Sequence, residues 1–432
     1  MEFINVIGAG LAGCEAAWQL LSRGVPVRLF EMRPGKMTPA HRSGGWAELV
    51  CSNSLRAAGV ENAVGLLKAE MRLLDSLILQ AADATAIPAG GALAVDRERF
   101  SAYIEEKLRS FPDLQVVEQE LTEIPAGLTI LAAGPLASDA LTRAILELTG
   151  SEELYFHDAI APIVEASSID MEKAFFASRY GKGDGTDYLN CPMNKEEYLV
   201  FYEALVGAEV FPLRDFEKEK HFTGCMPVES MARYGEDAIR FGPLKPVGLE
   251  LPDGSQAYAV LQLRKENAEG SMYNLVGCQT RLTRGEQQRV FRMIPGLEQA
   301  EFLRYGSMHR NTFINSPQVL DGYQRLKTRE DLYFAGQITG VEGYVESAAS
   351  GLMAGMLAAA QFRGEALPEF PETTAHGSML RFLRAGGGGS FQPMNVNFGL
   401  FPPLSQKIRN KKERYAALAQ RALSDMQAFA GK

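Results

Sequence analysis

With 432 residues, 46% of them apolar and 22% charged, the chain is long enough for two domains, and its composition excludes disordered and fibrous proteins. The formal net charge of -9 gives no general attraction to nucleic acid, so such a partner would need a local basic patch. We find neither a run of about 18 apolar residues nor a signal peptide, and expect a cytoplasmic protein that is not inserted in a membrane.

The first elements of the chain predict a βαβ unit. Residues 3–7 and 25–30 are apolar runs typical of buried strands, and residues 14–22 are typical of a helix. The glycine-rich turn GAGLAG joins the first strand to this helix. Such a turn leaves backbone N–H groups free for a dinucleotide pyrophosphate, and an acidic residue after the second strand can bind ribose hydroxyls. The residues expected at this site are Gly8, Ala9, Gly10, Leu11, Ala12, Gly13 and Glu31.

Two further segments belong to this first part of the chain. Residues 128–134 form an apolar run that closes on Gly134, as a parallel strand does where it meets a cofactor. Residues 91–97 resemble another flavoprotein segment, although its pair Asp96 and Arg97 is equally consistent with a surface ion pair.

The middle of the chain has a different composition. From about residue 151 to 305, aromatic and charged residues are more frequent, with Pro and Gly interspersed and strands expected at 258–263 and 274–278. This pattern predicts an inserted mixed α+β domain.

The last part returns to the style of the first. Residues 332–336 read as a buried strand, and a helix of small residues is expected from about 344 to 360. A second cofactor segment so far downstream favours FAD over NAD. Residues 386–389 are a glycine stretch that we expect to be flexible, and a basic helical segment begins near residue 405. The cofactor residues expected here are Gly336, Gln337, Gly343 and Tyr344, with Gln337 standing where related flavoproteins usually carry Asp.

These elements together predict an α/β fold. We expect a Rossmann-like FAD-binding domain of the glutathione-reductase type, formed by residues 1–150 and 306–432, with the inserted α+β domain at 151–305.

Five cysteines, an odd number without a CxxC pair, disfavour a disulfide framework and a zinc site. Cys14 and Cys278 lie in apolar stretches and are predicted to be structural, whereas Cys191 has no context that decides its role. Cys51 and Cys225 have polar or cationic neighbours, and a cation near a thiol favours the nucleophilic thiolate. These neighbours alone leave open whether either thiol is catalytic.

Nine segments, in order along the chain, resemble one bacterial family, the folate- and FAD-dependent tRNA uracil-C5 methyltransferases. A weaker resemblance is to the flavoprotein that modifies the wobble uridine of tRNA, whose long C-terminal helical domain is not expected in a chain of this length. A small-molecule flavin oxidoreductase without an RNA substrate is the alternative from another class. The segments are VIGAGLAGCEAAWQL, LFEMRPGKMTPAH, ELVCSNSL, GGALAVDRERF, DYLNCPM, CMPVE, FGPLKPVGL, GSMHRNTFINSP and FAGQITGVEGYVESAASG.

The resemblance implies methylation of a T-loop uridine in tRNA. Methylenetetrahydrofolate would donate the carbon, by way of the reduced flavin, and NADH or NADPH would reduce the FAD. A thiolate would add to uracil C6 and so activate C5. The resemblance gives this role to Cys225 and makes Cys51 the second thiol, which assists removal of the C5 proton or protects the flavin; the two assignments can be exchanged.

The resemblance also suggests contacts with folate and tRNA. His309 could stack on the folate pterin, and it is equally consistent with a histidine in a domain interface. A target uridine would have to leave its stack to enter the flavin pocket. The basic residues that could bind tRNA phosphates, or else form solvated helix faces, are Lys407, Arg409, Lys411, Lys412, Arg414, Arg281 and Arg284.

Overall fold

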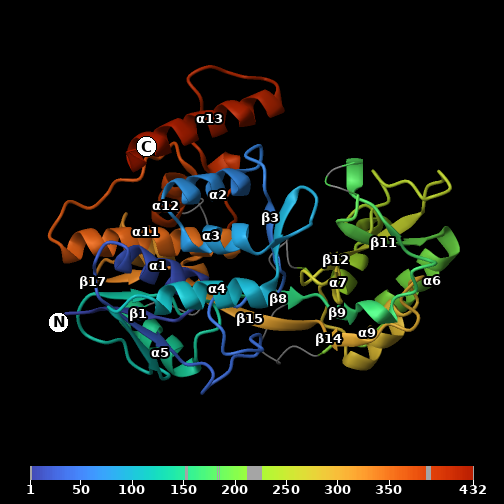
Figure 1. The fold of residues 1–432 in the computed structure, drawn as a ribbon, viewed down its shortest axis with the longest axis horizontal. Helices are drawn as coiled ribbons and strands as arrows, with labels where there is room; N and C mark the ends of the chain where they lie inside the picture. Colours follow the sequence, from blue (N-terminus) through green and yellow to red (C-terminus); the bar gives the residue numbers. More distant parts are fainter. Residues whose placement is uncertain are drawn as a thin grey trace.

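Two sheets, each with its own helices, lie side by side in the molecule, the first at the left of Figure 1 and the second at the right. Among the described helices, none has the length and apolarity required to cross a membrane. The computed structural model describes residues 2–150, 154–181, 183, 185–211, 226–385 and 391–431, with backbone alone at 154–158 and 309–310.

The first sheet has six strands in the order β16-β17-β7-β1-β2-β6, and all except the edge strand β16 are parallel. Strand β17 comes from the last third of the chain and pairs with β7, so the two ends of the sequence build one sheet. The predicted α/β class is confirmed. The strands are β1 (Ile4–Ile7), β2 (Val27–Glu31), β6 (Leu114–Glu118), β7 (Thr129–Leu131), β16 (Arg325–Leu326) and β17 (Arg329–Phe334).

Helices α1 and α11 cross at very short range beside this sheet. A Cβ atom on Gly351 would lie 2.1 Å from the carbonyl oxygen of Ala12, and one on Gly355 would lie 2.8 Å from that of Ala16. This contact explains why the late helix is rich in small residues. The helices of this domain are α1 (Leu11–Leu21), α2 (Ala63–Leu73), α3 (Leu77–Ala84), α4 (Arg97–Arg109), α5 (Asp139–Thr149), α10 (Ser316–Val319), α11 (Tyr344–Phe362), α12 (Ala375–Ala385) and α13 (Lys411–Ala430).

A small antiparallel sheet, in the order β3-β5-β4, directly precedes helix α4 within the first domain. Asp96 ends this sheet, is buried, and caps α4 by accepting hydrogen bonds from the backbone N–H groups of Glu98 and Arg99. The alternative of a surface ion pair between Asp96 and Arg97 is therefore wrong, because the arginine pairs with Glu266 instead. The strands are β3 (Ser54–Ala57), β4 (Ala86–Ile87) and β5 (Ala92–Val95).

The second sheet is antiparallel, in the order β10-β11-β12-β13-β9-β14, and has a separate apolar core. All its strands fall within the range expected for the inserted domain. The strands are β9 (Ile163–Glu165), β10 (Phe175–Phe176), β11 (Tyr188–Met193), β12 (Ala259–Lys265), β13 (Met272–Leu275) and β14 (Phe302–Arg304), and the helices are α6 (Lys195–Val206), α7 (Val228–Ala232), α8 (Glu236–Arg240) and α9 (Arg284–Phe291).

A two-stranded ribbon joins the two domains (Figure 1). Strand β8 (Leu154–Ile160) leaves the first domain and β15 (Ser307–Phe313) returns to it, and the two pair antiparallel along their whole length. The chain therefore enters and leaves the inserted domain at the same place.

Lys68 of α2 is fully buried, and its ammonium group donates to the carbonyl oxygens of Leu55 (2.7 Å) and Ala57 (2.6 Å). The residue between these carbonyls, Arg56, has a φ of 63°, in the left-handed region that non-glycine residues seldom adopt. Lys68 thus fixes a strained backbone. Burial, and then the nearby charge of Arg56, lowers the pKa of Lys68 to about 7.

This lowered pKa predicts a pH-dependent stability. Above about pH 7 and below the ordinary pKa of 10.5, the unfolded chain holds more protons at Lys68 than the folded chain, so the free energy of unfolding should rise with pH. Lys68→Met is expected to remove about 1.4 kcal/mol of this rise per pH unit. Urea denaturation at the two ends of the window measures it, with Lys107→Met at an exposed position as the control. An unchanged slope would contradict the prediction.

Candidate functional site

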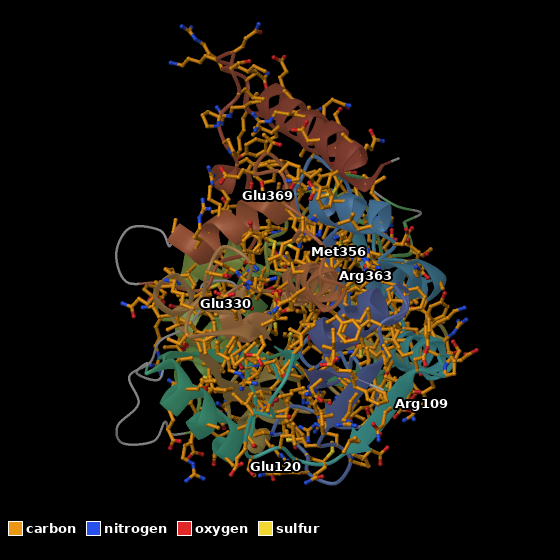
Figure 2. The ribbon with its side chains drawn as sticks, turned by 90° about the vertical axis from the view of Figure 1, so that its left-hand side faces the viewer. Arg109, Glu120, Glu330, Met356, Arg363 and Glu369 are labelled. Atoms are coloured by element: carbon orange, nitrogen blue, oxygen red, sulfur yellow. The ribbon has the colours of Figure 1, made fainter. Side chains whose placement is uncertain are left out.

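A cavity of about 1020 Å³, open to solvent, lies where β1, β2 and β7 end and α1 begins. The carboxyl edge of a parallel sheet is where such folds bind their ligands. In the side view of Figure 2, Glu120 of the cavity wall lies at the end of the molecule away from α13. The predicted cofactor residues in the wall are Gly8, Gly10, Leu11, Ala12, Glu31, Gly134, Gly336, Gln337 and Tyr344.

The glycine turn gives this cavity free hydrogen-bond donors. Gly10 is the N-cap residue of α1 and has no side chain with which to cap the first N–H groups of the helix. A Cβ atom added at Gly10 would have no neighbour within 4 Å, whereas one at Gly13 would lie 1.8 Å from the carbonyl oxygen of Gly8. One glycine therefore keeps space open beside the cavity, and the other lets the helix approach the strand. This arrangement fits the pyrophosphate of FAD.

Glu31 ends β2 at the same cavity. Its carboxylate accepts hydrogen bonds from the backbone N–H of Ala9 (2.8 Å) and from the guanidinium of Arg33 (2.9 and 3.2 Å). Burial alone would raise its pKa, but the hydrogen bonds and the charge of Arg33 outweigh it, so the pKa lies below the usual value of 4.5. Glu31 is therefore ionised at neutral pH, a suitable acceptor for ribose hydroxyls.

The second cofactor segment lies against the first. The N–H of Gly336 donates to Ser350 Oγ (3.0 Å), and a Cβ atom on Gly336 would lie 2.9 Å from that of Ala12. Gln337, which stands where related flavoproteins carry Asp, donates its amide to Glu342 (2.6 Å). The carboxylate of Glu342 therefore lies next to the position where related flavoproteins carry Asp. Gly343 is the N-cap residue of α11 and, like Gly10 at α1, has no side chain with which to cap the helix.

Tyr344 connects the cavity wall to the thiol of Cys51. Its hydroxyl oxygen accepts from the N–H groups of Cys51 (2.7 Å) and Ser52 (3.2 Å), and it lies 2.8 Å from Cys51 Sγ. Burial raises the pKa of Tyr344 well above 10.0, so the phenol keeps its proton. Because the two N–H groups occupy the oxygen lone pairs, that proton is available to the sulfur. This geometry favours sulfur as an acceptor, as in a thiolate.

Two arginines from different domains hold the backbone just before this thiol. Arg97 of α4 donates to the carbonyl oxygen of Leu49, and Arg304 of β14 donates to that of Val50. Burial, and then the like charge of Arg97, lowers the pKa of Arg304 to about 10. Two cations thus lie beside Cys51, a setting that stabilises a thiolate.

A third arginine fixes the residues after the thiol. Arg264 of β12 donates to Ser52 Oγ (2.7 Å) and to Asn53 Oδ1 (2.9 Å), while the amide of Asn53 donates to the carbonyl oxygen of Lys265 (2.8 Å). The loop that carries Cys51 is therefore held by both domains. Neither Arg264 nor Arg304 was identified from the sequence, since both are more than 200 residues from the loop and carry no local signal.

The other thiols differ sharply from Cys51. Cys14, Cys191 and Cys278 are fully buried, and burial raises the pKa of each thiol, to about 12 for Cys191 and Cys278. These three cysteines are structural, as expected for Cys14 and Cys278. Cys225 lies outside the described residues, so its expected role as the nucleophile stays a prediction.

The residues expected to contact tRNA fall in two places. The C-terminal group is exposed around the start of α13, where a hollow of about 1300 Å³ is lined by Lys407, Arg409 and Arg414 together with aromatic residues. Figure 2 shows this helix standing at one end of the molecule. None of the C-terminal group, Lys407, Arg409, Lys411, Lys412 and Arg414, forms an ion pair with any residue that the structure describes.

The second group is only partly accessible. Arg284 is exposed and lies 5.5 Å from the ring centre of Tyr305, but Arg281 is only 6% exposed and packs beside Glu229. A phosphate contact at Arg281 is therefore not supported in this conformation. His309 belongs to β15, and its side chain lies outside what the structure describes, so the folate contact also stays a prediction.

Comparisons with known proteins find similar sequences along nearly the whole chain. The sequence profile of the family described as glucose inhibited division protein A matches residues 3–366. The chain is 60% identical to the methylenetetrahydrofolate–tRNA-(uracil-5-)-methyltransferase TrmFO of Enterococcus faecalis, over 98% of each chain. It is 58% identical to the TrmFO of Bacillus pumilus, over 99% of this chain and 98% of the other.

A solved structure has a similar fold. GidA of Aquifex aeolicus superimposes with a TM-score of 0.72 at 16% identity, covering 99% of this chain and 73% of that one. At this identity the match supports the fold, an α/β domain with an insertion, and no more.

Proposed function

The chain belongs to the TrmFO family of methylenetetrahydrofolate–tRNA-(uracil-5-)-methyltransferases, and from this membership we propose that it methylates C5 of a uridine in the T loop of tRNA. The carbon comes from methylenetetrahydrofolate and the electrons from NADH or NADPH. One observation supports this proposal most strongly: a thiol beside two arginines and a tyrosine hydroxyl lies at the edge of a dinucleotide cavity.

The residues around the cavity fit FAD. The uncapped start of α1 would bind the pyrophosphate, and Glu31 would bind ribose. When bound, FAD would supply the hydride for reduction of the one-carbon unit and would carry that unit to the base. The protein supplies the binding groups and the thiols.

The thiols would activate the uracil ring. A thiolate that adds to C6 pushes electrons to C5, which then attacks the carbon donor. From the family resemblance we assign this addition to Cys225. Three of the other four thiols are buried and carry raised pKa values, so Cys51 is the one other candidate. After transfer, C5 must lose its proton before the bond to Cys225 can break. Cys51, as a thiolate that accepts the Tyr344 hydrogen bond, takes this proton.

The RNA would be held through its phosphates. The exposed C-terminal group gives five cations in a chain whose net charge is -9, so it can attract phosphate locally. Its affinity for tRNA should then fall steeply with salt. C5 and C6 must be reached from both ring faces, so the uridine would leave its stack.

A labelling experiment tests the function. Unmodified tRNA transcript, NADPH and methylenetetrahydrofolate labelled in its one-carbon unit are incubated with the FAD-loaded protein, and digested tRNA is searched for labelled ribothymidine. We expect label in the T loop, and none in a transcript whose T-loop uridine is cytidine. Label that requires S-adenosylmethionine, or no label, would overturn the proposal.

Cysteine variants test the chemistry separately. Cys225→Ala should remain yellow with bound FAD but lose methylation by at least about a thousandfold, because no other step replaces addition to C6. Cys14→Ala, at a buried thiol, is the matched control and should stay active. Full turnover by Cys225→Ala would show that another group, with Cys51 the first candidate, is the nucleophile.

A further inference from the structure

Tyr180 is held in an unusual state on the inserted domain. It follows β10, its φ is 60°, in the left-handed region, and its side chain is 61% exposed. A non-glycine residue in this region costs on the order of 1 kcal/mol. Burial of the ring does not offset this cost, because most of the ring surface faces solvent.

The neighbouring residues fix this strained tyrosine firmly. Its N–H donates to the carbonyl oxygen of Gly248 (2.9 Å), and the side chain of Arg179 donates to Gln262 (2.8 Å) and to the carbonyl oxygen of Val247 (2.9 Å). A Cβ atom on Gly248 would lie 2.7 Å from the tyrosine ring, so the ring lies directly against that glycine. The ring is therefore presented in one orientation.

A lysine lies beside this ring, and a second pair of lysine and aromatic ring lies four residues earlier, at the end of β10. The ammonium of Lys245 lies 5.9 Å from the ring centre of Tyr180, and that of Lys265 lies 6.0 Å from the ring centre of Phe176, which is 41% exposed. Neither lysine pairs with a carboxylate in the described part of the chain. The nearby Asp187 is buried and directed inward, accepting from the backbone N–H of Gly90 (2.8 Å).

This surface adjoins the reactive loop. The carbonyl oxygen of Lys265 accepts the amide of Asn53, two residues after Cys51. The hydroxyl of Tyr188 donates to the carbonyl oxygen of Ala89 (3.2 Å), so the segment around Tyr180 is also tied to the first domain. A nucleic acid with one base at Cys51 would have its neighbouring nucleotides close to these rings.

We propose that Phe176, Tyr180, Lys245 and Lys265 form a stacking surface on the inserted domain for unpaired bases of the tRNA. Rings stack on bases of any sequence, and lysines beside them neutralise phosphates. Because the ring is already oriented, binding does not have to order it. The inference rests on the proposed function and adds the position of the RNA on the protein.

Binding of fluorescent tRNA transcript to the FAD-loaded full chain tests the surface. Tyr180→Gly removes the ring at a backbone position that glycine adopts without strain, so its thermal midpoint should not fall. We expect its affinity for tRNA to fall about tenfold or more. Tyr180→Phe should restore affinity, and Lys245→Gln should lower the slope of log affinity against log salt by about one. Leu303→Ala, at the opposite edge of the same sheet and 52% exposed, is the control.

The outcomes separate this inference from the proposed function. The inference is supported if Tyr180→Gly binds single-stranded oligouridylate more weakly but binds duplex RNA as before. Methylation by this variant should stay intact at saturating tRNA. Unchanged tRNA affinity in Tyr180→Gly, or an equal loss in Leu303→Ala, would overturn it while leaving methylation in place. Failure of the unaltered protein to methylate tRNA would overturn the proposed function itself.

Discussion

Gly13→Ala is expected to destabilise the first domain and abolish FAD binding. The new methyl group would lie 1.8 Å from the carbonyl oxygen of Gly8, a backbone atom that cannot move without displacing β1 or α1. Overpacking of a core usually costs 1–3 kcal/mol, and a contact with backbone this short should cost at least about 3 kcal/mol. Urea denaturation measures the loss, and flavin absorbance per chain measures the cofactor.

Gly10→Ala in the same turn is the matched comparison. Gly10 has a φ of -78° that any residue adopts, and its added Cβ would have no neighbour within 4 Å. The stability of the FAD-free protein should therefore be unchanged, while FAD affinity falls because the methyl group occupies space at the uncapped helix start. Equal loss of stability in both variants would contradict this division of roles between the two glycines.

Arg97→Met should have the second large effect, through the contact between the domains. Arg97 pairs with Glu266, whose side chain is 1% exposed, and the methionine would leave that carboxylate buried without its cation. Such a loss typically costs 3–5 kcal/mol, so we expect a decrease of about 3 kcal/mol in the free energy of unfolding. The double variant Arg97→Met, Glu266→Leu should recover most of it, because an apolar pair can replace a buried ion pair.

The same variants separate stability from thiol chemistry. Removal of a cation beside Cys51 should raise the pKa of the thiol and slow its alkylation by iodoacetamide about tenfold near neutral pH, in the single and the double variant alike. Peptide mapping identifies the alkylated residue, with the buried Cys14, Cys191 and Cys278 as internal standards that stay unmodified. If the double variant regained both stability and reactivity, Arg97 would act on Cys51 only through the fold.

The sequence alone was sufficient to predict features that depend on residues close together in the chain. The turn from Gly8 to Gly13 combines a buried strand, a helix start and an acidic residue within one βαβ unit, and spacing alone reveals that combination. The strand at residues 332–336 could also be predicted, because a strand buried on both faces is continuously apolar. The α/β class followed from these two segments.

Contacts between distant residues could not be read in this way. The hydroxyl of Tyr344 meets Cys51 across 293 positions, and Arg304 reaches the same loop across 254. Neither pairing leaves a periodic pattern, because the first depends on how α11 packs against the Cys51 loop within the first domain, and the second on how the two domains dock. Arg281 shows the opposite error. A basic residue in a charged segment was expected at the surface, but Arg281 is buried and its backbone N–H donates to Glu229 of α7.

The crossing of α1 and α11 has a consequence for synthesis of the chain. Ala12 emerges from the ribosome early, but the glycine that packs on it, Gly351, follows about 340 residues later. At typical elongation rates this delay is roughly 20 to 70 s. During that time the nascent βαβ unit has neither strand β17 nor helix α11 to cover it, while the inserted domain has its own core and can fold first. Gly336, Gln337 and Tyr344 of the cavity wall also belong to this last part, so the cavity is complete only when translation is nearly finished.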